Sequence, residues 1–133
     1  MIIDCHGHYT TAPKGLQAYR DAQIAGLKDL RVARTERARV DISDDEIRQS
    51  LENAQLKLQR ERGTDVTIFS PRASAMAHHI GDATTSLHWS EHCNDLIHRV
   101  CALYPDNFVG VCQLPQTPGE PLGELHRRSS SAA

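Results

Sequence analysis

The stretch MIIDCHGHYT, residues 1–10, joins a short apolar run to two histidines that stand two positions apart. An apolar run that ends in polar residues predicts a buried strand over residues 1–9. Successive side chains of a strand alternate between its two faces, so we expect Asp4, His6 and His8 to project together. Two imidazoles on one face of a strand can bind the same metal ion, and the rest of the chain decides whether they do.

Apolar residues recur at helical or strand spacing along the rest of the chain. Ser43 and Glu46 form a capping box, and Pro105 ends a long amphipathic segment. We expect helices over residues 13–34, 43–63 and 84–104, and strands over residues 66–69 and 108–114. Helices that connect successive apolar strands predict a parallel sheet. The fold class is therefore α/β, with about three parallel strands and crossover helices.

Composition excludes several classes of protein. The chain has 39% hydrophobic and 24% charged residues, and 15 Lys+Arg nearly balance 17 Asp+Glu, which is typical of a globular protein. This balance implies no nucleic acid and no membrane as partner. We expect a cytoplasmic protein, because the chain has neither an apolar run of about 20 residues nor a start of signal-peptide type.

The end of the chain differs from the rest. From Pro115 onward it contains proline, glycine and a terminal run of Ser and Ala without apolar periodicity. We expect residues 1–119 to form a β/α domain and residues 120–133 to form a divergent, disordered tail.

The histidine pair follows the first expected strand, and parallel α/β folds place their active sites at the carboxyl ends of strands. Zn²⁺ accepts neutral imidazole nitrogens, and a catalytic zinc site usually has three protein ligands and an open position. His6 and His8 would supply two of them. The alternative is a pair of histidines that only form hydrogen bonds at the end of a strand.

The Asp-x-His-x-His pattern of residues 4–8 resembles the first strand of the amidohydrolase superfamily, whose members are metal-dependent (β/α)8 enzymes. The similarity extends over residues 1–16, 43–82 and 89–119, which resemble the N-terminal third of a hydratase branch that acts in the breakdown of aromatic compounds. The resemblance implies an N-terminal part of a TIM-type barrel. It also implies that His6 and His8 bind zinc, or another divalent cation.

By the same resemblance the enzyme is a hydro-lyase that adds water to the C=C bond of a small unsaturated tricarboxylate, and the full-length parent is a homo-oligomer. A complete barrel typically needs about 250 residues. The remaining ligands and the acid–base residues would come from later strands, so no catalytic residue is assigned here. We expect the 133-residue chain to be truncated and weakly active or inactive.

Three residues near the second strand are candidates for substrate binding. Arg72 can bind a carboxylate through two parallel N–H···O bonds, and Ser70 offers one hydroxyl. His79 can donate to a carboxylate or transfer a proton. A solvated loop arginine and an ordinary loop histidine are the alternatives for Arg72 and His79.

Two other patterns are interpreted as structural. His88 to His92 match the H-x-x-E-H pattern of zinc peptidases, but the helix has the apolar face of an outer crossover. The basic residues between Lys28 and Arg39 adjoin an acidic stretch and are interpreted as solvated surface. Two rival functions stay open, a metal-dependent decarboxylase of the same superfamily and a non-catalytic α/β association module.

Overall fold

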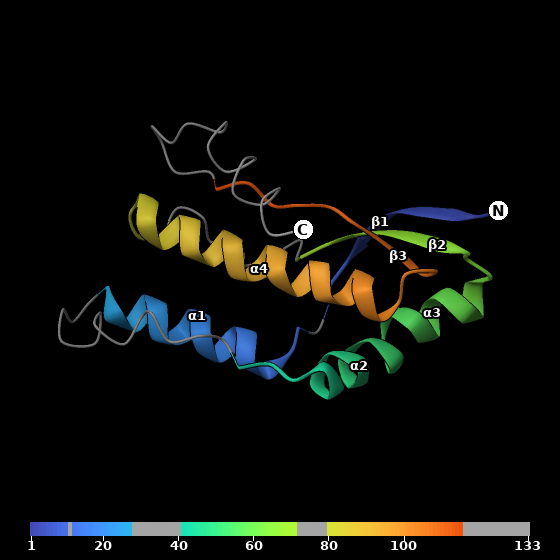
Figure 1. Ribbon diagram of the computed structural model, residues 1–133, viewed down its shortest axis with the longest axis horizontal. Coiled ribbons are helices and arrows are strands. Elements are labelled where there is room, and N and C mark those ends of the chain that lie inside the picture. The colour runs from blue at the N-terminus through green and yellow to red at the C-terminus, as the bar shows by residue number, and fades with distance from the viewer. Residues whose placement is uncertain (11, 28–40, 72–79, 116–133) are drawn as a thin grey trace.

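Three parallel strands form one sheet in the order β1-β2-β3 (Figure 1). The computed structural model describes residues 1–10, 12–27, 41–71 and 80–115. Within them lie β1 (Ile3–His8), β2 (Val66–Ser70) and β3 (Phe108–Gly110). The predicted parallel sheet is confirmed. The third strand is shorter than expected, although the Val111 amide still donates to the Phe69 carbonyl at 2.9 Å.

The helix expected over residues 43–63 is two helices, α2 (Asp44–Glu52) and α3 (Gln55–Arg62). Ala54 lies between them at φ −129° and ψ −93°, outside the helical region. The expectation of one continuous helix is therefore wrong. Gly63 ends α3 at φ 66°, a left-handed conformation that glycine adopts without steric cost.

The capping box at the start of α2 is only half formed. The Glu46 amide donates to Ser43 Oγ at 3.1 Å, as the pattern predicts. The Glu46 carboxylate does not return to Ser43 but accepts from the Gly15 amide at 3.2 Å. Glu46 thereby ties α2 to the first turn of α1 (Lys14–Gly26), which is the described part of the helix expected over residues 13–34.

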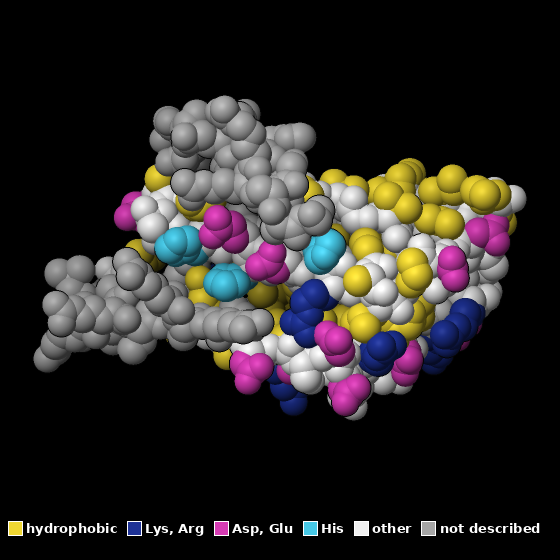
Figure 2. Space-filling model, in the orientation of Figure 1, with side chains coloured by type: hydrophobic (Ala, Val, Ile, Leu, Met, Phe, Trp, Pro, Cys, Tyr) yellow, Lys and Arg dark blue, Asp and Glu magenta, His cyan; other side chains and the backbone are white. Residues whose placement is uncertain are grey.

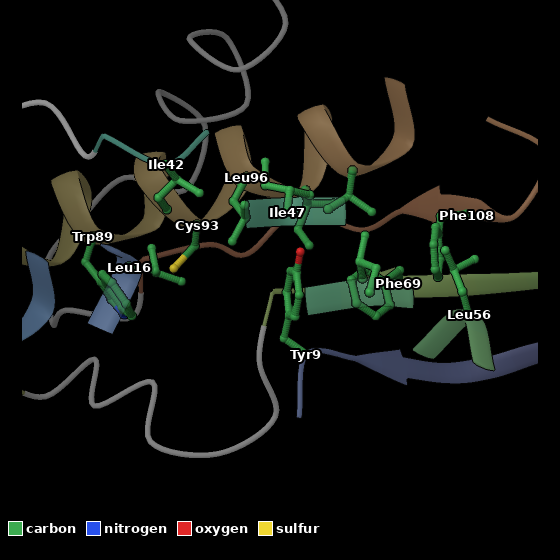
Figure 3. Close-up of a cluster of buried hydrophobic side chains, with 13 residues drawn as sticks. Tyr9, Leu16, Ile42, Ile47, Leu56, Phe69, Trp89, Cys93, Leu96 and Phe108 are labelled. Carbon is green, nitrogen blue, oxygen red and sulfur yellow. The ribbon is translucent and has the colours of Figure 1, made fainter. Parts of the chain in front are cut away.

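The helices cover one face of the sheet, and the core lies between them and that face (Figure 3). Thr67 and Phe69 of β2 are buried, whereas the alternate residues of the strand are only half-buried. The Phe69 ring contacts Phe108 and Tyr9, with ring centroids 4.8 and 5.1 Å away. Farther along the core, Trp89 and Leu16 join the long helix α4 (Ala83–Leu103) to α1.

The opposite face of the sheet is apolar and open. Ile3 of β1 is 53% exposed and Val109 of β3 is 54% exposed. Hydrophobic side chains gather at the end of the molecule where the chain begins (Figure 2). In a (β/α)8 barrel the helices lie outside and this face of each strand is packed in the interior.

Helix α1 lies beside α4, and both extend past the carboxyl ends of the strands (Figure 1). The Arg20 guanidinium lies over the Trp89 ring, 4.8 Å from its centroid, and Gln23 Nε2 donates to the Thr85 carbonyl at 3.0 Å. In the described parts of the chain, no helix has the length and apolar character needed to cross a membrane.

Candidate metal centre

His6 and His8 lie next to each other at the carboxyl end of β1. Their ring centroids are 5.5 Å apart, and the ring planes meet at 73°. His6 is exposed and His8 is half-buried. His8 pairs with Ser70 of β2, so both strands end at the same edge of the sheet.

A β-bulge lies inside the Asp-x-His-x-His pattern. Asp4 pairs with Thr67 and Gly7 pairs with Phe69, so β1 contains one more residue than β2 between the two pairs. Asp4 therefore shares the helix-covered face with Thr67, and His8 shares the open face with Ser70. The expectation that Asp4 projects with His8 is wrong, because strict alternation does not hold across a bulge.

The bulge is stabilised from within β1. The His6 amide donates to the Asp4 carboxylate at 2.9 Å, an interaction between residues two positions apart. Asp4 thus acts on the backbone between the two strand pairs. Its carboxylate supports the position of His6 through the main chain.

Gly7 allows β1 and β2 to approach closely. A methyl group in its place would lie 2.1 Å from Thr67 Cγ2 and 2.8 Å from the Ile68 carbonyl oxygen. Both distances are shorter than Cβ contacts in proteins, so any larger residue would displace the strand that carries the histidines. The requirement is spatial, because Gly7 lacks the positive φ of Gly63 and Gly81.

The His8 ring is oriented by a hydrogen bond to the main chain. His8 Nδ1 lies 3.1 Å from the Tyr9 carbonyl oxygen, and a carbonyl can only accept. In the neutral imidazole this hydrogen bond requires the proton on Nδ1, which leaves the lone pair that a metal ion needs on Nε2.

Two side chains donate hydrogen bonds to backbone carbonyls of the Asp-x-His-x-His segment. Ser70 Oγ donates to the Gly7 carbonyl at 3.1 Å, and Gln55 Nε2 donates to the His8 carbonyl at 3.1 Å. Ser70 was predicted as a substrate residue and is also part of the support of β1. Gln55 carried no signal in the sequence, since a half-buried glutamine in a polar helix is ordinary.

His6 and His8 can supply part of a zinc site. Two adjacent imidazoles, one with Nε2 unprotonated, are suitable donors, but a catalytic zinc site needs a third protein ligand. Among the residues that the structure describes, no group of three or more His, Cys, Asp or Glu side chains could hold a metal ion. A third ligand would have to come from other residues.

Of the other residues that the sequence singled out, the structure describes only some. Arg72 and His79 lie outside the described residues, as does the basic run from Lys28 to Arg39. His92 of the H-x-x-E-H pattern packs edge-on against Tyr19, with ring centroids 4.4 Å apart. Burial lowers its pKa. The position of His92 agrees with the interpretation of α4 as an outer helix.

Comparisons with known proteins define the class. The chain matches the amidohydrolase family over residues 3–131, and it belongs to that family. It is 52% identical over 118 residues to 2-keto-4-carboxy-3-hexenedioate hydratase from Sphingobium sp. (strain NBRC 103272 / SYK-6), covering 89% of this chain and 34% of that protein.

A solved structure agrees with this assignment. The crystal structure of 4-oxalomesaconate hydratase, LigJ, from Rhodopseudomonas palustris superimposes with a TM-score of 0.84 at 47% identity. The superposition covers 98% of this chain and 40% of that chain. The predicted family and the predicted N-terminal part of a TIM-type barrel are confirmed. The chain spans between a third and two fifths of the length of these two relatives.

Proposed function

We propose that this chain forms the N-terminal part of a zinc-dependent hydratase that adds water to the C=C bond of 4-oxalomesaconate in the breakdown of protocatechuate or gallate. One observation carries the proposal. Two contacting imidazoles lie at the carboxyl end of β1, in a chain that is 47–52% identical to two hydratases over most of its length. His6 and His8 would be two ligands of the metal.

The chemistry follows from the substrate. The proposed substrate has a 2-keto group conjugated with its C3=C4 bond, which makes C4 electrophilic. Water adds at C4, and the electron pair of the double bond moves toward the ketone oxygen. A proton is then added at C3. When bound, zinc lowers the pKa of a coordinated water to about 7 and stabilises negative charge on oxygen. The substrate carries three carboxylates, which require cationic or hydrogen-bonding partners.

Ser70, Arg72 and His79 are our candidates for those partners. Ser70 lies beside His8 in the sheet register, and its hydroxyl donates to the Gly7 carbonyl while keeping acceptor capacity. Arg72 follows two residues later, and its guanidinium matches a carboxylate in shape and charge. His79 would donate to a second carboxylate or transfer a proton.

The proposed substrate also bears on the location and the partners of the enzyme. The substrate is a small metabolite, so we place the enzyme in the cytoplasm and assign it neither a nucleic-acid nor a membrane partner. The complete enzyme would be a homo-oligomer. Another divalent cation could replace zinc at two imidazole ligands.

A chimaera tests this function. The aligned 118 residues of the Sphingobium hydratase are replaced by those of this chain, and 4-oxalomesaconate consumption is followed by loss of its conjugated ultraviolet absorbance. We expect a product 18 mass units heavier, from the addition of one water, and no CO₂. His6→Ala or His8→Ala should abolish turnover, because groups that act as a unit are lost together.

The 133-residue chain alone should not hydrate the substrate above a zinc-only control, since His6 and His8 are only two of the three protein ligands that a catalytic zinc site usually has. Release of CO₂ by the chimaera would instead identify the decarboxylase. The exposed residues Ile3 and Val109 favour a second candidate, the non-catalytic association module. A chimaera without activity, combined with self-association of the short chain, would support that candidate.

A further inference from the structure

We infer that Gln55 is a positioning residue that sets the tautomer and direction of the His8 ring, and thereby the metal affinity of the histidine pair. The inference rests on the metal site of the proposed function. It concerns residues of this chain alone, and all of them are described by the structure.

The Gln55 side chain bridges His8 and Thr10, where the chain leaves β1. Its Nε2 donates to the His8 carbonyl at 3.1 Å and to Thr10 Oγ1 at 2.9 Å. Both hydrogens of the amide group are therefore used on either side of Tyr9. Tyr9 itself is 1% exposed, and its hydroxyl lies 3.5 Å from Ser50 Oγ.

The two hydrogen bonds from Gln55 control the position of the Tyr9 carbonyl, which is the hydrogen-bond partner of the His8 ring. The Tyr9 carbonyl accepts from His8 Nδ1 at 3.1 Å, and that carbonyl lies between the two groups that Gln55 binds. With residues 8 and 10 both held, the peptide plane after Tyr9 cannot rotate freely. The bond keeps the proton on Nδ1 and leaves Nε2 for a metal ion.

The break between α2 and α3 places Gln55 where it can reach β1. Gln55 is the first residue of α3, directly after the non-helical Ala54. In one continuous helix over residues 43–63, this part of the helix would have a different path. The break therefore contributes to the site through Gln55.

Gln59 offers a matched control on the same helix. Its Nε2 also donates to two backbone carbonyls, those of Asp65 at 3.2 Å and Asn107 at 3.1 Å. These carbonyls precede β2 and β3, at the edge of the sheet opposite the histidines. Gln59 is more deeply buried, its Oε1 also accepts from Asn107 Nδ2 at 3.2 Å, and none of these hydrogen bonds involves His8.

The experiment compares Gln55→Met with Gln59→Met in the 133-residue protein. Methionine keeps the length of the side chain and removes the amide. Imidazole nitrogen NMR reports the His8 tautomer in metal-free protein, and a Zn²⁺ titration with the same signals reports affinity. Thr10→Val, at an exposed position, removes one of the two acceptors and serves if Gln55→Met does not fold.

We expect His8 in the Nδ1–H tautomer in the unmodified protein. Gln55→Met should yield a tautomer mixture and weaken Zn²⁺ binding by up to about tenfold, the lower end for loss of a group that bonds a metal ligand directly, because Gln55 acts on the His8 ring through the backbone. Thr10→Val should cause a smaller change in the same direction, and Gln59→Met should leave both readouts as they are.

An unchanged tautomer and affinity in Gln55→Met, or an equal loss in Gln59→Met, would overturn the inference. If neither the unmodified protein nor the chimaera with the Sphingobium hydratase binds Zn²⁺ through His6 and His8, the metal site of the proposed function fails. The tautomer comparison needs no metal, so it decides the role of Gln55 independently of that result.

Discussion

Replacement of Gly7 by alanine tests the close contact between β1 and β2. The added methyl would lie 2.1 Å from Thr67 Cγ2 and 2.8 Å from the Ile68 carbonyl oxygen. Thr67 is 6% exposed and the carbonyl is part of the sheet, so neither can move away without disturbing its neighbours. Overpacking of this kind costs about 1–3 kcal/mol. We expect a loss of about 2–3 kcal/mol of unfolding free energy, near the upper end of that range.

Urea unfolding at neutral pH measures this loss, and a double-mutant cycle assigns its cause. Thr67→Ser removes the methyl group that lies closest, so Gly7→Ala combined with Thr67→Ser should be more stable than the sum of the single changes predicts, by about 0.5–1 kcal/mol. The backbone clash with the Ile68 carbonyl would remain, and recovery should be partial.

Gly63→Ala provides the control. Nothing lies within 4 Å of a methyl group at Gly63, but its φ of 66° disfavours alanine by about 1 kcal/mol. This change should be additive with Thr67→Ser. The reasoning is refuted if Gly7→Ala costs no more than Gly63→Ala, or if its effect is also additive with Thr67→Ser.

Two further predictions concern pH and helix capping. Burial lowers the pKa of His92, so the unfolded chain takes up a proton near pH 6.5 that the folded protein resists. Stability should fall as the pH drops below about 6.5, and His92→Phe should reduce the difference between unfolding free energies measured at pH 7.5 and 5.5. A difference that is equal in the variant would contradict this. Asp82 caps α4 by accepting from the Thr85 amide at 2.9 Å and from Thr85 Oγ1 at 2.8 Å, which lowers the Asp82 pKa. Asp82→Ala should cost about 1 kcal/mol in urea unfolding at pH 7, and Asp82→Asn should cost less. The cap contribution should be present above about pH 3.9 and disappear as the pH falls through the lowered pKa, so an equal loss from Asp82→Ala at lower pH would argue against the cap.

The helical crossovers and the parallel sheet could be predicted because their signals are local. Val66 to Phe69 form a short apolar run, and the long amphipathic segment before Pro105 has the 3.6-residue period of a helix. The Ser43 cap likewise depends on residues three positions apart. The histidine pair was found for the same reason, since its spacing lies within a single strand.

The bulge in β1 and the break before Gln55 could not be predicted, because both depend on contacts between distant parts of the chain. The bulge exists only in the pairing of β1 with β2, about 60 positions later. The helical pattern continues through Ala54, and Gln55 gains its role from reaching His8 and Thr10, 47 and 45 positions earlier.

The sequence by itself determined the order of elements, the fold class and the chemistry available at the end of β1, since each depends on residue type and short-range spacing. Only the tertiary structure decided which groups share a face of the sheet. Asp4 pairs with Thr67 on the helix-covered face, and His8 pairs with Ser70 on the open face. One extra residue in β1 shifts the alternation of side chains between the two faces. The direction of the His8 ring was decided in the same way, by the Tyr9 carbonyl, whose position depends on Gln55 of helix α3.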